Sequence, residues 1–215
     1  CALQVACADR VPVACELAVG VRPEGRGTAF DVAEPHTLGL PGGRTVRVRC
    51  KIDRVDALVP GTDEYVVCDY KTGSSSVYHS RGPFHNGRFM QGTLYPVLAE
   101  FALRERLGGE PRVVRFEYVF PAPGEARRLS WGTDELADGL HIVGLVCDMM
   151  ASGCFPFTDD EADLKYSEYT GAFGDIAGAL ASVRRKLDNP ENVMLEPYRR
   201  LRGLRVAGRE GEGDD

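Results

Sequence analysis

Hydrophobic and polar residues alternate most regularly over residues 46–53, which read VRVRCKID. On an extended chain every second side chain points to the same face, and here one face is apolar while the other is charged. The apolar positions are Val46, Val48, Cys50 and Ile52. This period of two predicts a half-buried β-strand. Weaker patterns of the same kind predict further strands over residues 11–19, 65–69 and 113–120, and a short one within 28–40.

A periodicity near 3.6 residues predicts helices in the second half of the chain. The clearest covers residues 86–107, and its apolar stripe is Met90, Leu94, Val97 and Phe101. Pro96 lies inside this pattern, so we expect a kink near Tyr95. Two more helices are expected, over residues 133–153 and 176–187.

Two aspartates and a lysine accompany the central pair of strands. Asp53 is expected to end the first strand and Asp69 the second, with a turn at Pro60-Gly61 between them. Lys71 follows Asp69 at i+2 and therefore projects to the same side. Carboxylate oxygens are ligands that Mg²⁺ prefers, and an ammonium group can orient or deprotonate a water molecule. This combination is what a hydrolytic Mg²⁺ site requires.

The predicted helix over residues 86–107 carries polar residues next to its apolar stripe. Arg88, Gln91 and Tyr95 lie together on that neighbouring face, at i, i+3 and i+7. Gln91 and Tyr95 are i,i+4 neighbours, so both can reach a single site.

Composition narrows the function classes. The chain has 215 residues and a net charge of −6, so as a whole it is not a polycation that coats nucleic acid, although a local basic face is compatible with that sum. No apolar run reaches the ~18 residues of a membrane span, and there is no signal peptide. The seven cysteines are odd in number and contain no CxxC pair, so neither a disulfide framework nor a zinc ribbon is supported. We expect mostly buried thiols in a reducing compartment, and a cytoplasmic, nucleoid-associated location.

Three short motifs, KIDRVD, VVCDYKTG and QGTLY, follow one another between residues 51 and 95. Together they resemble the PD-(D/E)XK nuclease superfamily, and most closely its RecB/AddB branch with the CRISPR-associated relatives. The pattern of that branch runs GxIDRxD, then DYK[ST]G, then QxxxY. The resemblance covers about half of the chain, residues 11–120, and it is specific because all three motifs occur in order. It implies an α/β, restriction-endonuclease-like core with a mixed central β-sheet flanked by helices, followed by a helical C-terminal extension.

The resemblance also implies roles for individual residues. The metal ligands would be Asp53, Asp69 and the backbone carbonyl of Tyr70. Lys71 would position or activate the attacking water, while Gln91 and Tyr95 would support the lysine and contact DNA. The cofactor would be Mg²⁺ or Mn²⁺.

Basic residues supply further candidate DNA contacts. Arg54 is expected to pair with Asp56 and brace Asp53, with a direct phosphate contact as the alternative. The candidate DNA-binding residues are Arg54, Arg88, Arg184, Arg185 and Lys186. For the last three, a solvated helix end is an equal alternative. His79 and His85, in the loop after the DYK strand, are expected at the surface, with a DNA contact as the alternative.

The chain departs from the family pattern in three places. Cys50 replaces the glycine before the IDR element. The upstream helix that carries a His or Glu ligand is missing, and because the sequence begins on Cys1 we expect a piece of a longer chain. Residues 163–174 lack the cysteines that many relatives use for a cluster, so no iron–sulfur cluster is expected.

These patterns predict three segments: a nuclease core over residues 1–157, lacking its first helix, a basic helical extension over 158–208, and a disordered acidic tail over 209–215. The expected activity is a Mg²⁺-dependent deoxyribonuclease, exonuclease rather than endonuclease, which processes single-stranded DNA or DNA ends with a helicase domain or subunit in repair. No membrane partner is expected. The alternatives are a catalytically inactive nuclease-fold module that binds DNA or scaffolds a repair complex, and a nuclease of a phage or CRISPR-type defence system.

Overall fold

The computed structural model describes residues 10–23, 25–58, 62–76, 78, 82–121, 126–165 and 167–203. Several features expected from the sequence lie outside these residues: Cys1, Cys7, Pro60-Gly61, His79 and the tail over 209–215. The chain divides into two compact units, Cys1–Val143 and Gly144–Asp215. The predicted segment boundaries at residues 157 and 208 stay predictions.

A five-stranded mixed sheet forms the centre of the first unit. Its strands, in spatial order, are β1 (Val11–Val19), β4 (Cys50–Ala57), β5 (Glu64–Tyr70), β6 (Arg112–Phe120) and β7 (Arg127–Gly132). Neighbouring strands are antiparallel except for β5 and β6, which are parallel. The predicted mixed α/β core is therefore confirmed. The strand β7 was not predicted, because RRLSWG offers only two apolar positions to a pattern search.

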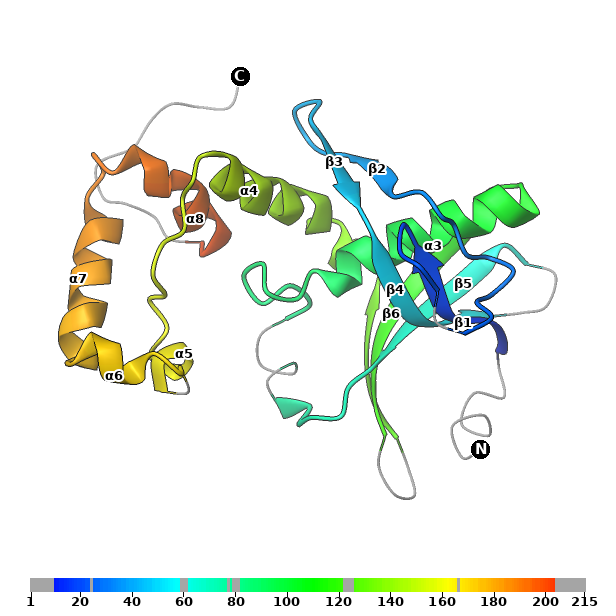
Figure 1. Ribbon diagram of the computed structural model, residues 1–215, viewed down its shortest axis with the longest axis horizontal. Coiled ribbons are helices and arrows are strands. Elements are labelled where there is room, and N and C mark those ends of the chain that lie inside the picture. Colours follow the sequence, from blue (N-terminus) through cyan, green and yellow to red (C-terminus); the bar gives the residue numbers. More distant parts are fainter. Residues whose placement is uncertain are drawn as a thin grey trace. The chain divides into compact units, whose positions relative to one another are not determined.

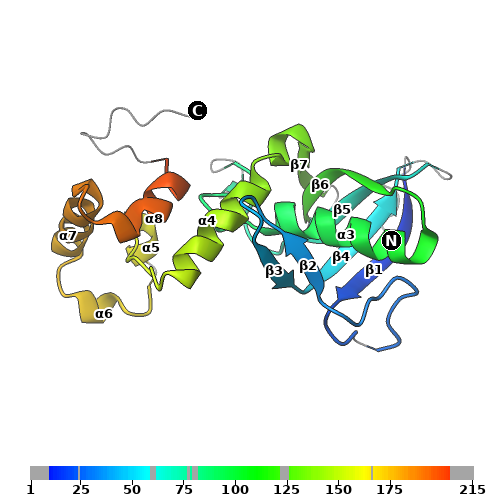
Figure 2. The ribbon, with the colours of Figure 1, turned by 90° about the horizontal axis from the view of Figure 1, so that it is seen from above.

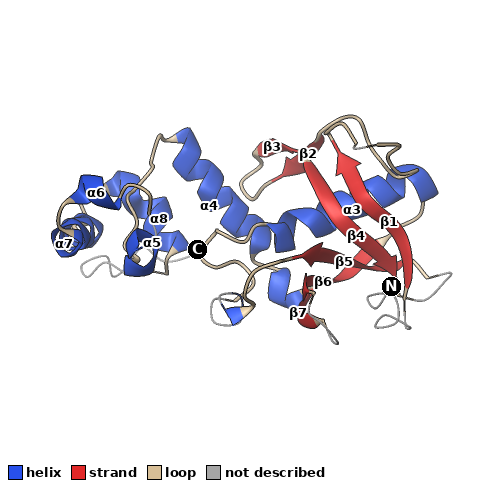
Figure 3. Cartoon of the chain, turned by 60° about the horizontal axis from the view of Figure 1, so that its bottom comes forward, coloured by secondary structure: helices blue, strands red, loops and turns tan. Residues whose placement is uncertain are grey.

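One helix, α3 (Gln91–Leu107), connects the parallel strands and lies along one face of the sheet (Figure 3). Its fully buried apolar residues pack with the sheet side chains in the main core: Leu98, Ala99, Ala102 and Leu103. The predicted stripe was therefore wrong as the buried face: Met90, Leu94, Val97 and Phe101 are all only half-buried, although Leu94 and Phe101 pack against the core.

The helix also begins later than predicted, at Gln91 rather than near residue 86. The backbone explains this difference, because His85, Asn86 and Gly87 have φ angles of 41°, 53° and 83°. These are left-handed conformations that a right-handed helix cannot contain. The helix runs through Pro96 as one element.

A hairpin of two strands, β2 (His36–Gly39) and β3 (Thr45–Val48), forms a separate small sheet. The single strand predicted from Val46 onward was wrong, since the chain changes partner at Arg49: β3 pairs with β2, whereas β4 pairs with β1. The alternation continues across Arg49, so the sequence carries no mark of the change. The hairpin lies beside α3 (Figure 2), where the rings of His36 and Phe101 are 4.2 Å apart.

The helix predicted over residues 133–153 is divided into a 3₁₀ turn, η1 (Asp134–Leu136), and α4 (Gly139–Ala151), which continues into the second unit. The second unit is helical (Figure 1), with α5 (Glu161–Lys165), α6 (Thr170–Phe173), α7 (Ile176–Asp188), η2 (Val193–Leu195) and α8 (Glu196–Leu201). The predicted helix over 176–187 is confirmed as α7. Among the described helices, none combines the length and hydrophobicity that a bilayer crossing requires.

A buried arginine holds the second unit together. Arg199 is 1% exposed and donates hydrogen bonds to the carbonyl oxygens of Leu187, Asn189 and Asn192. Its side chain thereby satisfies carbonyl groups at and after the end of α7, which would otherwise lack a donor.

The cysteines are less buried than expected. Cys68 and Cys154 are buried, but Cys15 is exposed and Cys50 and Cys147 are half-buried, and all five are free thiols. Cys15 lies on β1, the edge strand of the sheet, where it and the next residue, Glu16, are both exposed.

Candidate active site

The two aspartates lie opposite each other on neighbouring strands. In the antiparallel register of β4 and β5, Arg54 faces Cys68, and one step further Asp53 faces Asp69. Side chains opposite each other in such a pair share a face and have Cβ atoms about 4.5–5.5 Å apart. Asp53 does not end its strand as predicted, because β4 continues to Ala57. Its Oδ2 accepts a hydrogen bond from the backbone N–H of Tyr70 at 2.7 Å, which ties the two strands together at the site.

Asp69 is buried beside the catalytic lysine candidate. The residue is 3% exposed, and its Oδ2 lies 2.6 Å from the Nζ of Lys71. Burial raises the pKa of Asp69 above its ordinary value, the Lys71 ammonium lowers it, and the charge of Asp53 raises it again. The negative charge on Asp69 therefore depends on nearby positive charge, which a bound cation would increase.

The side-chain amide of Gln91 connects these groups. Its Oε1 accepts a hydrogen bond from Lys71 Nζ at 2.9 Å, and its Nε2 donates to Asp69 Oδ1 at 2.9 Å and to the Tyr95 hydroxyl at 3.3 Å. The orientation of the amide follows from chemistry, since an ammonium group can only donate and a carboxylate can only accept. The structure thus brings together five of the residues singled out by the sequence: Asp53, Asp69, Lys71, Gln91 and Tyr95.

Tyr118 on β6 completes this cluster and was missed in the sequence. It is fully buried, its hydroxyl donates to Gln91 Oε1 at 3.3 Å, and its ring centroid lies 5.1 Å from Lys71 Nζ. Burial raises the pKa of Tyr118, with further contributions from Asp69, so the hydroxyl stays protonated as a donor. Gln91 consequently uses both lone pairs of its oxygen and both N–H groups of its nitrogen. We name Asp53, Asp69, Lys71, Gln91, Tyr95 and Tyr118 the catalytic cluster.

Tyr118→Phe is expected to lower the catalytic rate about tenfold, because it removes one of two donors that fix the Gln91 amide while keeping the ring under Lys71. The measurement is steady-state cleavage of a labelled oligonucleotide. Tyr65→Phe is the matched control, since Tyr65 is also a buried tyrosine of the sheet, at the opposite end of β5 from Asp69. Equal rates for the two variants would contradict a role for the Tyr118 hydroxyl.

The donor set around Asp53 and Asp69 fits a divalent metal. Both carboxylates and the neighbouring Tyr70 carbonyl offer oxygen ligands, as Mg²⁺ and Mn²⁺ require. The Oδ2 atom of Asp69 is buried. It lies within ion-pair distance of Lys71 Nζ but accepts no hydrogen bond from the described residues. Within the described ranges, no group of three or more His, Cys, Asp or Glu side chains is arranged so that it could hold a metal ion by itself.

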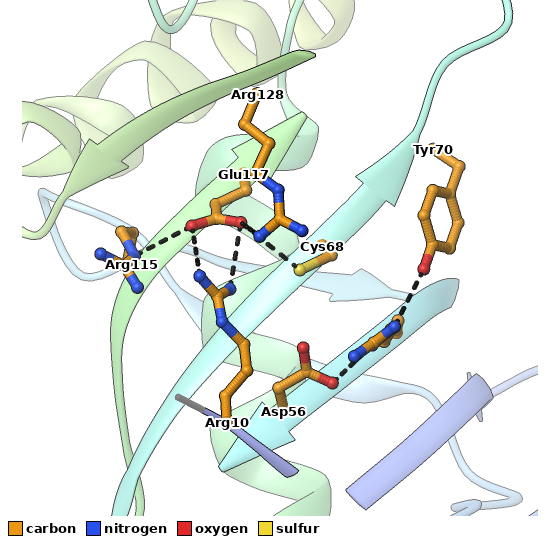
Figure 4. A network of polar contacts seen from close by, with 8 residues as sticks. Arg10, Asp56, Cys68, Tyr70, Arg115, Glu117 and Arg128 are labelled. Atoms are coloured by element: carbon orange, nitrogen blue, oxygen red, sulfur yellow. Dashed lines mark hydrogen bonds and ion pairs between the residues drawn. The ribbon is translucent and has the colours of Figure 1, made fainter. Parts of the chain in front are cut away.

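The opposite face of the sheet carries a second polar network (Figure 4). Since Tyr118 faces α3, its neighbour Glu117 points to the other side. Glu117 is 3% exposed and pairs with the guanidinium groups of Arg10, Arg115 and Arg128, at 3.1, 3.1 and 3.6 Å. The thiol of Cys68 lies 3.8 Å from Glu117 Oε2.

Arg54 belongs to this opposite face. Its Nε lies 2.5 Å from Asp56 Oδ1, and its NH1 donates to the Tyr70 hydroxyl at 3.4 Å. Both Arg54 and Asp56 are buried, so the pair braces β4 and β5 directly behind Asp53 and Asp69. The structure does not bring Arg54 into the catalytic cluster, and a DNA contact by this residue stays a prediction.

The remaining candidate DNA-binding residues lie outside the catalytic cluster. Arg88 is exposed just before α3. Arg184, Arg185 and Lys186 are exposed on α7 of the second unit. Their predicted contacts with DNA stay predictions. His85, expected at the surface, is buried and lies 4.8 Å from the ring of Phe89.

Comparison with known proteins identifies the superfamily of this chain. The sequence matches the PD-(D/E)XK nuclease superfamily over residues 3–198, and the chain therefore belongs to this superfamily. No curated protein matches it. Members are generally hydrolases that cleave phosphodiester bonds of nucleic acids with divalent metals such as Mg²⁺ or Mn²⁺. The mixed sheet with flanking helices is consistent with the restriction-endonuclease-like fold.

Proposed function

We propose that this chain is a metal-dependent deoxyribonuclease that degrades DNA from its ends. The observation that carries the proposal is the Gln91 amide, which joins Lys71 to Asp69 directly opposite Asp53. A solvated surface lysine and an unrelated aspartate would not share a half-buried, fully hydrogen-bonded partner. An arrangement of this kind fixes the positions of the reacting groups before substrate arrives.

Four residues of the catalytic cluster have a direct role in this proposal. Asp53 and Asp69, with the Tyr70 carbonyl, would hold the metal ion. Lys71 orients the attacking water, and Gln91 keeps the ammonium group in place between carboxylate and substrate. When bound, Mg²⁺ or Mn²⁺ would polarise the scissile phosphate and stabilise the departing 3′ oxygen.

The branch of the superfamily, the substrate, the partner and the location are proposed from the motifs. We place the chain in the RecB/AddB-like branch, acting on single-stranded DNA or DNA ends beside a helicase domain or subunit in repair, in the cytoplasm at the nucleoid. The support is the combination of KIDRVD, VVCDYKTG and QGTLY in one chain.

Removal of metal is expected to abolish cleavage. An oligodeoxynucleotide labelled at either its 5′ or its 3′ end should be shortened with Mg²⁺ or Mn²⁺ and remain intact with EDTA, and a ladder of products from one end would show exonuclease action. Manganese soaked into crystals should give an anomalous peak beside Asp53 and Asp69.

Two results would count against the proposal. Cleavage in EDTA at the same rate would exclude a metal-dependent mechanism. Binding of DNA without cleavage in any divalent metal would instead support the non-catalytic nuclease-fold module.

A further inference from the structure

The hairpin that precedes β4 carries a concentration of positive charge. Residues 36–52 contain Arg44, Arg47, Arg49 and Lys51 and no aspartate or glutamate, whereas the chain has a net charge of −6. A charge of +4 over 17 residues of an acidic protein needs an explanation, because like charges on adjacent positions repel one another.

The two faces of the hairpin differ. On one face, Leu38 is 5% exposed and the ring of His36 lies against that of Phe101 of α3, so the hairpin is anchored to the core. On the other face of β3 Arg47 is exposed, and Arg49 is the exposed residue that joins β3 to β4; neither arginine forms an ion pair within the described part of the chain. Lys51 differs from them, because its Nζ is paired with Glu16 at 2.6 Å. The arginines are thus held on a rigid support with their guanidinium groups available.

The same chain segment leads into the catalytic cluster. Arg49 precedes Asp53 by four residues and Arg47 precedes it by six. Consecutive Cα atoms are about 3.8 Å apart, so the two arginines lie within about 15 and 23 Å of Asp53 along the backbone. A strand that crosses Asp53 can therefore reach both arginines within a few nucleotides.

We propose that the exposed face of the β2–β3 hairpin, through Arg47 and Arg49, binds the phosphodiester backbone of the nucleic acid strand whose scissile bond lies at Asp53 and Asp69. This inference rests on the proposed nuclease function and assigns a substrate-binding surface to it.

The chemistry of the two side chains favours phosphate. A guanidinium group presents a planar set of donors that matches two oxygens of a phosphate. Arg47 and Arg49 are two positions apart, so their Cα atoms lie at most about 7 Å from each other, a spacing suited to neighbouring charges of a polyanion. Contacts of this kind position the substrate and carry no base preference.

The test compares Arg47→Ala/Arg49→Ala with a control that removes the same charge elsewhere. Arg104→Ala/Arg112→Ala serves as the control, since both residues are exposed and Arg112 lies opposite Glu64 in the strand register, at the end of β5 remote from Asp69. Binding of fluorescent single-stranded and duplex DNA is measured in EDTA as a function of salt. Each lost phosphate contact lowers the salt slope by about 0.7 for a single strand, so the hairpin variant should lose about 1.4 in slope and bind on the order of tenfold more weakly at about 0.1 M salt.

A second substrate separates this proposal from the nuclease function. Hydrolysis of bis(p-nitrophenyl) phosphate, which is too small to reach the hairpin, should be unchanged in the hairpin variant. An unchanged salt slope in that variant, with DNA binding intact, would overturn the hairpin proposal while leaving the nuclease function standing. Loss of binding to a polyglutamate peptide but not to DNA would assign the surface to an acidic protein and overturn the proposal as well. Wild-type chain that binds DNA through the hairpin but hydrolyses neither substrate would instead refute the nuclease function alone.

Discussion

A loss of nuclease activity of about 10³-fold is expected when Lys71 is replaced by methionine, because the substitution removes the ammonium group that we propose orients the attacking water. Gln91 and Asp69 would each lose a partner, at 2.9 and 2.6 Å, but the strands that carry the metal ligands would remain paired. The fold should persist, as circular dichroism would show. The measurement is single-turnover cleavage of an end-labelled oligonucleotide with saturating Mg²⁺.

A charge-matched variant controls for this substitution. Arg112→Met also removes one positive charge from the sheet, but Arg112 lies at the end of β6 remote from Tyr118 and should leave cleavage unchanged. Wild-type cleavage by Lys71→Met would remove Lys71 from the mechanism and, with it, the interpretation of the cluster as an active site.

Glu117→Gln is expected to reduce the free energy of unfolding by about 3–5 kcal/mol, well above the effect of breaking an exposed ion pair. The buried carboxylate is shared by three guanidinium groups, and Arg10 makes a two-pronged contact with it at 3.1 and 3.2 Å. A neutral amide of the same shape leaves those charges without a counter-ion in a buried site. Some of the cost is screened because Arg115 and Arg128 are partly exposed.

The single tryptophan makes this measurement specific to the first unit. Trp131 is buried in the main core, so its fluorescence during urea denaturation follows the sheet rather than the helical second unit. Glu110→Gln is the control, because the Glu110–Arg104 pair is largely exposed and should contribute less than about 1 kcal/mol. Equal denaturation midpoints for the two variants would show that the buried network does not stabilise the fold.

The strands and the residues of the site that lie close in sequence could be predicted well. Asp69 and Lys71 share a face because they are two positions apart on a strand, and Gln91 and Tyr95 share one because they are four apart on a helix. Such relations depend on local geometry alone. The roles assigned to these residues stay predictions until activity is measured, although the structure brings their side chains together.

Other parts of the site depend on pairing between distant segments. Tyr118 reaches Gln91 only because β6 pairs in parallel with β5, where Tyr118 lies opposite Asp69. Arg54 is directed away from the site because it follows Asp53 by one position on β4, which alternation does predict, whereas its burial on that face depends on the segments that cover β4. The late start of α3 follows from left-handed residues at 85–87, where Gly87 adopts this conformation freely and Asn86 and His85 adopt it more readily than most other residue types.

The parallel pairing of β5 with β6 also affects how the protein acquires its chemistry during folding. The backbone N–H of Lys71 donates to the carbonyl of Val119 at 2.9 Å, so the lysine is secured by a segment 48 positions downstream. Closing such a long loop costs conformational entropy before the stabilising contacts can form. Contacts of large sequence separation therefore form slowly. With the role proposed for Lys71, water activation would be acquired late, because a nascent polypeptide that has not yet docked β6 carries the acidic residues but lacks the anchored amine.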